Sequence, residues 1–349
     1  MRGFEAAASS GPRRGLRRRG TVRVAVATAA ALLLAACGGN GDGDPDPDDP
    51  ESDEASAETD DDVIELSVAV ASFDVAVGEG QRLMAGVFTP ERELLTFGEV
   101  EFRLGYLGDE EGGEAVLGQE AIASYLPVPG WEPDGDADQP TLQTDVDGQG
   151  VYAAEVDLDE PGNYGLMVTA ELDDGRVGHG QATFPVVDDS QVPDIGDEAP
   201  RTVNYTIDDV SDGTIQPISL DSRAQSENDE IPDTHLHDTV IADAIDEGQP
   251  LIVAVSTPVY CQSQFCGPLT ETLADIGHEY EDVVDVVMLE VWEDFEGQEL
   301  NASASEWIET EMGGNEPWVF LVGEDGTIID RWDNVLDVGE LEAHLDELG

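Results

Sequence analysis

The sequence predicts a multidomain chain: an all-β sandwich in the N-terminal half, followed by a C-terminal α/β domain. From residue 63 to 187, apolar and polar residues alternate in short runs that turn motifs separate. From residue 234 onward, continuous apolar runs alternate with helical segments, the order typical of a sheet covered by helices on both faces. The chain has 349 residues and 40% are hydrophobic, enough for two packed cores.

These patterns divide the chain into five segments. We expect a lipoprotein signal peptide at 1–36, an acidic disordered tether at 37–62, a β-sandwich domain at 63–187, a linker and entry segment at 188–233, and the α/β domain at 234–349.

The N-terminus has the features of an export signal. An Arg-rich stretch precedes the apolar run Val24–Ala36, which at ~1.5 Å per residue is too short to cross a hydrocarbon core of ~30 Å. The ending Leu-Ala-Ala-Cys37-Gly resembles a bacterial lipobox, which implies cleavage before Cys37, diacylation of its thiol and a membrane-anchored, extracytoplasmic location. A plain secretory signal that leaves Cys37 free is the alternative.

Charge is the most unusual property of the composition. The chain has 14 basic residues, all Arg, against 79 acidic ones, and its net charge is −65. Such a chain repels a phosphate backbone, so nucleic acid is excluded as a main partner. We interpret the acidity as adaptation to a saline habitat, where carboxylate surfaces stay hydrated and salt screens their repulsion.

The β-rich segment has four clear alternating runs and three turns. The runs begin at Ile64, Val100, Val151 and Tyr164, and the turns are Asp147-Gly148, Pro161-Gly162 and Asp174-Gly175. Short strands with polar turns and no helical period favour a small, broadly immunoglobulin-like sandwich. It has no Cys and no cluster of candidate site residues, so we expect a spacer or a partner-binding module.

The C-terminal segment alternates predicted helices and strands. Helices are expected at 238–247, 268–276, 302–312 and 339–348, and strands at 251–255, 283–291, 319–322 and 327–332.

Two cysteines lie between the strand at 251–255 and the helix at 268–276. Beyond Cys37 the chain has only Cys261 and Cys266, so an intramolecular disulfide must join these two. On one straight helix their Cα atoms would stand ~7.5 Å apart along the axis, beyond the ~7 Å that a disulfide tolerates. Cys261 must therefore precede the helix, or the first turn must unwind. A helix N-terminus also favours a thiolate, the attacking form of a thiol.

This arrangement resembles the thioredoxin-like superfamily over residues 195–349. The resemblance lies in the strand that leads to Cys261, in Cys266-Gly-Pro268, and in Asn315-Glu-Pro317-Trp before a hairpin. The opening Gly196-Asp-Glu-Ala-Pro is similar to that of membrane-anchored thiol–disulfide oxidoreductases and peroxiredoxins. The pair here is Cys-x₄-Cys, whereas the family spacing is Cys-x-x-Cys.

The resemblance implies thiol–disulfide exchange without a cofactor. By its distance from the strand, Cys261 matches the family nucleophile and would attack, while Cys266 would resolve. Cys266 is the alternative nucleophile, because it lies closer to the helix N-terminus. A cis Pro317 together with Pro258 would contact the substrate chain. The partners would be extracytoplasmic protein thiols or disulfides, with the membrane contacted through the lipid on Cys37.

Three alternatives stay open. In the first, the Cys261–Cys266 pair is a structural disulfide in a non-catalytic binding or scaffold lipoprotein. A peroxiredoxin is less consistent, because Pro258 stands where that family has Thr, and Glu316 stands near the position of its Arg. A Sco-type copper site needs a suitably placed His; we interpret His235 and His237 as surface polar residues, and no metal is expected.

Overall fold

The structure is a computed structural model that describes residues 62–108, 116–131, 138–144, 150–261, 265–310 and 314–349. All of these residues belong to one contact unit, Ala57–Gly349. The predicted signal peptide, the lipidation of Cys37, the tether up to Asp61 and the Asp147-Gly148 turn lie outside the described residues.

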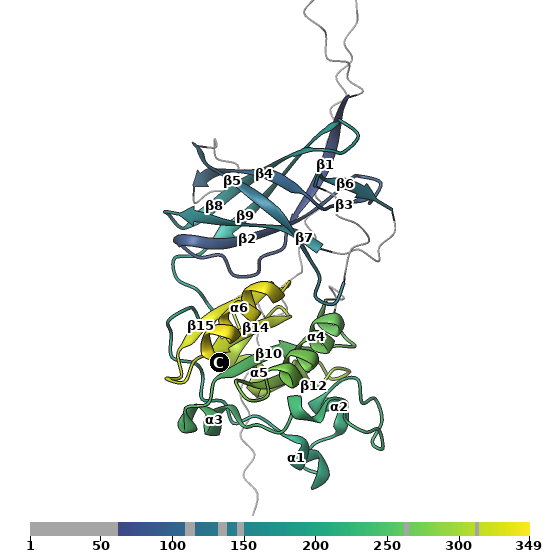
Figure 1. Cartoon of the computed structure of the whole chain (residues 1–349), viewed down its shortest axis with the longest axis vertical. Helices are drawn as coiled ribbons and strands as arrows, with labels where there is room; N and C mark the ends of the chain where they lie inside the picture. The colour runs from purple at the N-terminus through teal and green to yellow at the C-terminus, as the bar shows by residue number, and fades with distance from the viewer. Residues whose placement is uncertain (1–61, 109–115, 132–137, 145–149, 262–264, 311–313) are drawn as a thin grey trace, which may run out of the picture. The chain divides into compact units, whose positions relative to one another are not determined.

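Nine strands occupy the N-terminal region of the described chain (Figure 1). They are β1 (Val63–Val70), β2 (Gly78–Phe88), β3 (Leu94–Thr96), β4 (Glu99–Gly108), β5 (Val116–Pro127), β6 (Thr141–Gln143), β7 (Gly150–Leu158), β8 (Gly162–Glu171) and β9 (Val177–Val186). Seven of them form a closed barrel in the order β1-β9-β8-β4-β5-β7-β2, and β3 and β6 extend the sheet beyond β2.

Strand β1 closes the barrel because it pairs with a different neighbour at each end. Its first half, 63–67, runs parallel to β9, and its second half, 67–70, runs antiparallel to β2. Glycines on β9 permit this close approach: a Cβ at Gly178 would lie 2.5 Å from the Leu66 side chain, and one at Gly180 would lie 2.7 Å from the Leu66 carbonyl. Closure removes the exposed strand edges of an open sheet.

Alternate side chains of these strands fill the barrel core. Leu83, Phe102, Tyr152 and Leu166 are fully buried. The Tyr152 hydroxyl donates a hydrogen bond to the carbonyl of Phe97 at 2.7 Å. Burial raises the pKa of this phenol, so it stays a donor at all ordinary pH values.

The C-terminal region contains a four-stranded mixed sheet and short helices. The elements are α1 (Ile207–Ser211), α2 (Pro217–Leu220), the 3₁₀ turn η2 (Thr234–Leu236), α3 (Ile241–Glu247), β10 (Leu251–Ser256), α4 (Cys266–Glu279), β11 (Asp285–Glu290), β12 (Trp292–Asp294), β13 (Glu299–Leu300), α5 (Ala302–Ile308), β14 (Trp318–Val322), β15 (Ile328–Asp333) and α6 (Val338–Leu348). The sheet order is β11-β10-β14-β15, with β10 parallel to β11 and antiparallel to β14.

Helices cover both faces of this sheet because successive side chains of β10 point to opposite sides. Leu251, Val253 and Val255 pack with residues of α3 and α5. Ile252 and Ala254 pack with residues of α4 and α6. The strand is consequently buried along its whole length.

The predicted fold class is wrong. The chain is mostly β, with only 20% helix, and its N-terminal region is a closed seven-stranded barrel instead of an immunoglobulin-like sandwich. This low helix content relative to strand does not fit a C-terminal α/β thioredoxin-like domain. Alternation tells which face of a strand is buried, and that pattern is the same in a sandwich and in a barrel. Closure depends on the long-range pairing of β1, and two of the four expected helices, α3 and α5, have only seven residues each.

Most individual elements of the C-terminal region are nevertheless confirmed. The strand expected at 251–255 is β10, and the helix expected at 339–348 is α6. The helix expected at 268–276 begins two residues earlier, at Cys266, and continues to Glu279. The helix expected at 302–312 ends at Ile308.

Tyr152→Phe should destabilise the protein by about 1–3 kcal/mol, because the buried carbonyl of Phe97 loses its donor. The measurement is urea unfolding followed by circular dichroism. Tyr106→Phe is the matched control, since its hydroxyl donates to the Pro161 carbonyl at an exposed position. Equal unfolding midpoints for the two variants would contradict a stabilising role for the Tyr152 hydrogen bond.

Candidate functional site

Cys261 and Cys266 form a disulfide at the junction of β10 and α4. Their Cα atoms are 6.0 Å apart, within the usual range for this bond. Cys266 is the first residue of α4, whereas Cys261 precedes the helix and donates its amide N–H to the Thr257 carbonyl at 3.1 Å. The expectation that Cys261 lies outside the helix is confirmed.

The two cysteines differ in burial. Cys266 is fully buried, and its carbonyl accepts hydrogen bonds from the hydroxyls of Thr270 at 2.8 Å and Ser256 at 3.4 Å. Cys261 is only partly buried. Cys261 is therefore the more exposed residue of the pair.

Three strands bring the sequence-predicted residues to one edge of the sheet. Ser256 at the end of β10 is paired with Glu290 at the end of β11. Val255 is paired with Trp318, so Pro317, directly before β14, reaches the same edge. The Glu316–Pro317 peptide is cis, as predicted. Pro258 follows β10 by two residues and is half-buried.

Glu290 is a buried acid at this edge that the sequence analysis did not single out. It is 1% exposed, and its carboxylate accepts a hydrogen bond from the Ser222 amide at 2.9 Å. Burial raises the pKa of Glu290 to about 7, against the opposing effect of hydrogen bonds from the Ser222 and Trp292 amides. An acid within the apolar run 283–291 was the available signal, because a buried strand tolerates a carboxyl group only if it is neutral or hydrogen-bonded.

A second buried cluster lies beside Ser222. Asp221 is fully buried and lies 2.7 Å from Arg223 and 3.2 Å from the Nε2 of His237. Burial alone would raise the pKa of Asp221, but hydrogen bonds from His237 and Arg223 outweigh it and hold the pKa at about 2. Asp233 accepts a further bond from Arg223 at 2.7 Å. The interpretation of His237 as a surface residue is wrong, because this pairing with Asp221 fixes it in the interior, 1% exposed.

His235 also has a structural position. Its ring lies 3.9 Å from the ring of His278, and its Nε2 donates to the Ala274 carbonyl at 3.1 Å. Within the described ranges, no three His, Cys, Asp or Glu side chains are grouped so that they could hold a metal ion. Nor does any helix in those ranges have the length and apolar character needed to cross a membrane.

Three aromatic side chains contact one another in series, starting from the residue before Cys261. The ring of Tyr260, next to Cys261, stacks on Phe295 with centroids 4.0 Å apart and planes 4° from parallel. Phe295 in turn meets Trp292 edge-on at 5.5 Å. Phe295 and Val259 remain exposed by 42% and 45%, so this part of the surface is apolar.

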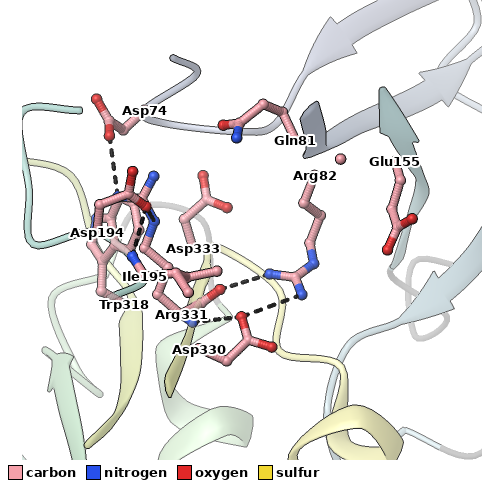
Figure 2. A pocket seen from close by; sticks show the side chains of 11 residues that line it. Asp74, Gln81, Arg82, Glu155, Asp194, Ile195, Trp318, Asp330, Arg331 and Asp333 are labelled. Atoms are coloured by element: carbon pink, nitrogen blue, oxygen red, sulfur yellow. Dashed lines mark hydrogen bonds and ion pairs between the residues drawn. The ribbon is translucent and has the colours of Figure 1, made fainter. Parts of the chain in front are cut away.

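A charged pocket links barrel residues to β15 (Figure 2). Arg331 lies 3.3 Å from Asp74 and 3.1 Å from Asp194. Arg82 of β2 donates to the Arg331 carbonyl at 2.6 Å and lies 2.5 Å from Glu340. These bonds occupy both guanidinium groups with carboxylates and a carbonyl of the chain itself.

Asp333 lies in the same pocket and accepts a hydrogen bond from the Phe73 amide. Burial raises the pKa of Asp333 to about 6, although Arg331 and Arg82 act to lower it. The pocket measures about 80 Å³, room for only a few water molecules. It therefore joins segments of the chain and has no space for a substrate.

Comparisons with known proteins give little likeness. No family model matches the sequence, and no curated protein matches it. The solved structure of MtrC from Shewanella baltica OS185 is similar over 38% of this chain and 24% of MtrC, about a quarter of its length, with 10% identity and a TM-score of 0.22. BslA, a bacterial hydrophobin, is similar over 36% of this chain and 98% of BslA, with 12% identity and a TM-score of 0.17. At these TM-scores neither likeness bears on fold or function.

Glu290→Gln should change how stability depends on pH. The folded protein keeps the Glu290 proton up to about pH 7, whereas the unfolded chain loses it near 4.5. Its contribution to stability is thus fully present below pH 4.5 and is lost as the pH rises through 7. The wild-type protein loses this contribution between pH 4.5 and pH 8, and the Gln variant does not. The free energy of unfolding of Glu290→Gln, relative to that of wild type, should therefore rise by on the order of 2–3 kcal/mol over this range.

The measurement is urea unfolding of both proteins at several pH values. Glu324→Gln, at an exposed position in the turn between β14 and β15, removes the same charge and should follow wild type. Parallel curves for Glu290→Gln and wild type would show that Glu290 does not titrate in this window.

Proposed function

We propose that the protein carries out thiol–disulfide exchange with protein substrates through Cys261 and Cys266. The observation that carries the proposal is the asymmetry of the pair: a partly exposed Cys261 is bonded to a fully buried Cys266 at the first turn of a 14-residue helix. The free N–H groups of that turn favour a thiolate, because they place partial positive charge beside it.

The exchange conserves atoms and electrons without a cofactor. With the protein reduced, the Cys261 thiolate attacks one sulfur of a substrate disulfide, and the other substrate sulfur leaves as a thiolate that takes a proton from water. The Cys266 thiolate then attacks the Cys261 sulfur, which re-forms the Cys261–Cys266 bond and releases the second substrate thiolate. Two electrons pass from the protein dithiol to the substrate disulfide. The reverse sequence oxidises a substrate dithiol.

Other residues at the same sheet edge are proposed to assist. Pro258, half-buried two residues after β10, and Pro317, directly before β14, are proposed to contact the substrate chain. The exposed apolar surface of Val259 and Phe295 suits an extended polypeptide that presents a cysteine.

The proposed location is the extracytoplasmic face of the membrane, with the chain anchored through lipid on Cys37. Its support is the lipobox-like sequence at residues 34–38. An oxidising compartment is also where two neighbouring thiols form a disulfide.

The competing proposal is a structural disulfide in a binding or scaffold protein, and the full burial of Cys266 favours it. The reduction potential of the pair separates the two. A potential of about −120 to −270 mV suits an exchanger, whereas one below about −300 mV indicates a structural bond.

The two cysteine variants should differ in reactivity. Cys266→Ser leaves the accessible Cys261, and we expect it to accumulate a mixed disulfide with a disulfide-bonded peptide. Cys261→Ser leaves only the buried Cys266, and we expect it to react at least about tenfold more slowly. Mass spectrometry of the adducts measures both. If neither variant forms an adduct in the folded state, the protein is not an exchanger.

A further inference from the structure

A pocket lies at the end of the aromatic contacts that begin beside Cys261. Tyr260 stacks on Phe295, Phe295 contacts Trp292, and Trp292 lines the pocket. Glu316, the residue before Pro317, lines it too. The pocket is therefore connected to Tyr260 through two ring contacts and to Pro317 through its neighbour Glu316.

The pocket has the size and lining of a side-chain binding site. Its volume is about 350 Å³, and its surface is more apolar than polar. Its lining includes Trp292, Leu300, Glu309 and Glu316. Two of these are acids, and among the described residues no basic side chain lines the pocket.

Glu316 gives the pocket an uncompensated negative charge. Burial raises its pKa, which means that its charged form is short of solvation. Within the described ranges Glu316 makes no ion pair, and every Arg that is less than one-third exposed is paired with other carboxylates. A cation from outside the chain would restore the lost solvation.

We propose that this pocket binds the Lys or Arg side chain of an extended polypeptide substrate whose cysteine reacts at Cys261; the proposal rests on the exchange function above. The methylene stem of such a side chain fits against Trp292 and Leu300, and its charge pairs with Glu316. A neutral apolar side chain would desolvate Glu316 further without pairing its charge. An acidic side chain would be repelled by the two carboxylates of the pocket and by the chain's net charge of −65.

The test uses short peptides whose single cysteine is disulfide-bonded to 2-mercaptoethanol. Lys, Leu or Glu is placed in turn at each position beside the cysteine, and the rate constant for reaction with the reduced protein is measured. At one position or more, the Lys peptide should react about three- to tenfold faster than its Leu counterpart, and the Glu peptide more slowly. Equal rates for Lys and Leu at every position would overturn the proposal.

Variants connect this preference to the pocket. Glu316→Gln should reduce the ratio of the Lys rate to the Leu rate to about one, because the nearly isosteric amide removes only the charge. Glu324→Gln, exposed at the opposite end of β14, lowers the net charge equally and should keep the wild-type ratio. Thermal unfolding checks that both variants are folded. A Lys preference that survives in Glu316→Gln would overturn the assignment to this pocket.

Two further readouts separate failure of the pocket from failure of the exchange. Hydroxyethyl disulfide tests the exchange alone: if it and all the peptides are unreactive, the proposed function fails, and the substrate assignment fails with it. Peptides with Ser in place of Cys test the pocket alone, through their binding to the oxidised protein by calorimetry. If the Lys peptides bind with no higher affinity than the Leu peptides, the proposal that this pocket binds a basic side chain is wrong, even if exchange proceeds.

Discussion

Buried carboxylates in this chain compete for very few cations. After residue 37 the sequence has seven Arg, no Lys and 78 of the 79 acidic residues. An ionised carboxylate loses solvation when it is buried, and it must be paired, hydrogen-bonded or neutralised. The three Arg side chains that are less than one-third exposed, Arg82, Arg223 and Arg331, each contact at least two carboxylates. They join the barrel to β15 and fix the cluster around Asp221.

The buried acids beyond the reach of those Arg side chains define the chemistry of the candidate site. Glu290, at the end of β11, makes no ion pair in the described part of the chain, and burial raises its pKa to about 7. Glu316 is half-buried without an ion pair in the described part of the chain, and its pKa is also raised. The same shortage of cations thus leaves one carboxyl group with a pKa near 7 and another without an ion pair in the described part of the chain.

Local sequence patterns predicted those features that depend on residues close together in the sequence, such as the position of a strand or the start of a helix. The apolar run at 251–255 specified a buried strand. The five-residue spacing of the cysteines, with a rise of ~1.5 Å per residue, left two arrangements for a disulfide, and the structure has the one in which Cys261 precedes the helix. Long-range contacts decided the rest. Barrel closure needs β1 to meet both β2 and β9, and the burial of His237 needs Asp221 from a distant segment. No spacing in the sequence encodes either contact.

Salt sharpens the difference between surface and interior charges. In about 1 M salt the Debye length is ~3 Å, so repulsion among exposed carboxylates is largely screened, while buried pairs are screened much less. A saline environment therefore makes a net charge of −65 tolerable without supplying partners for Asp221, Asp333 or Glu290. Those groups must be satisfied by the chain itself, through Arg, backbone amides or a retained proton. The buried carboxyl groups are therefore where charge acts on the structure.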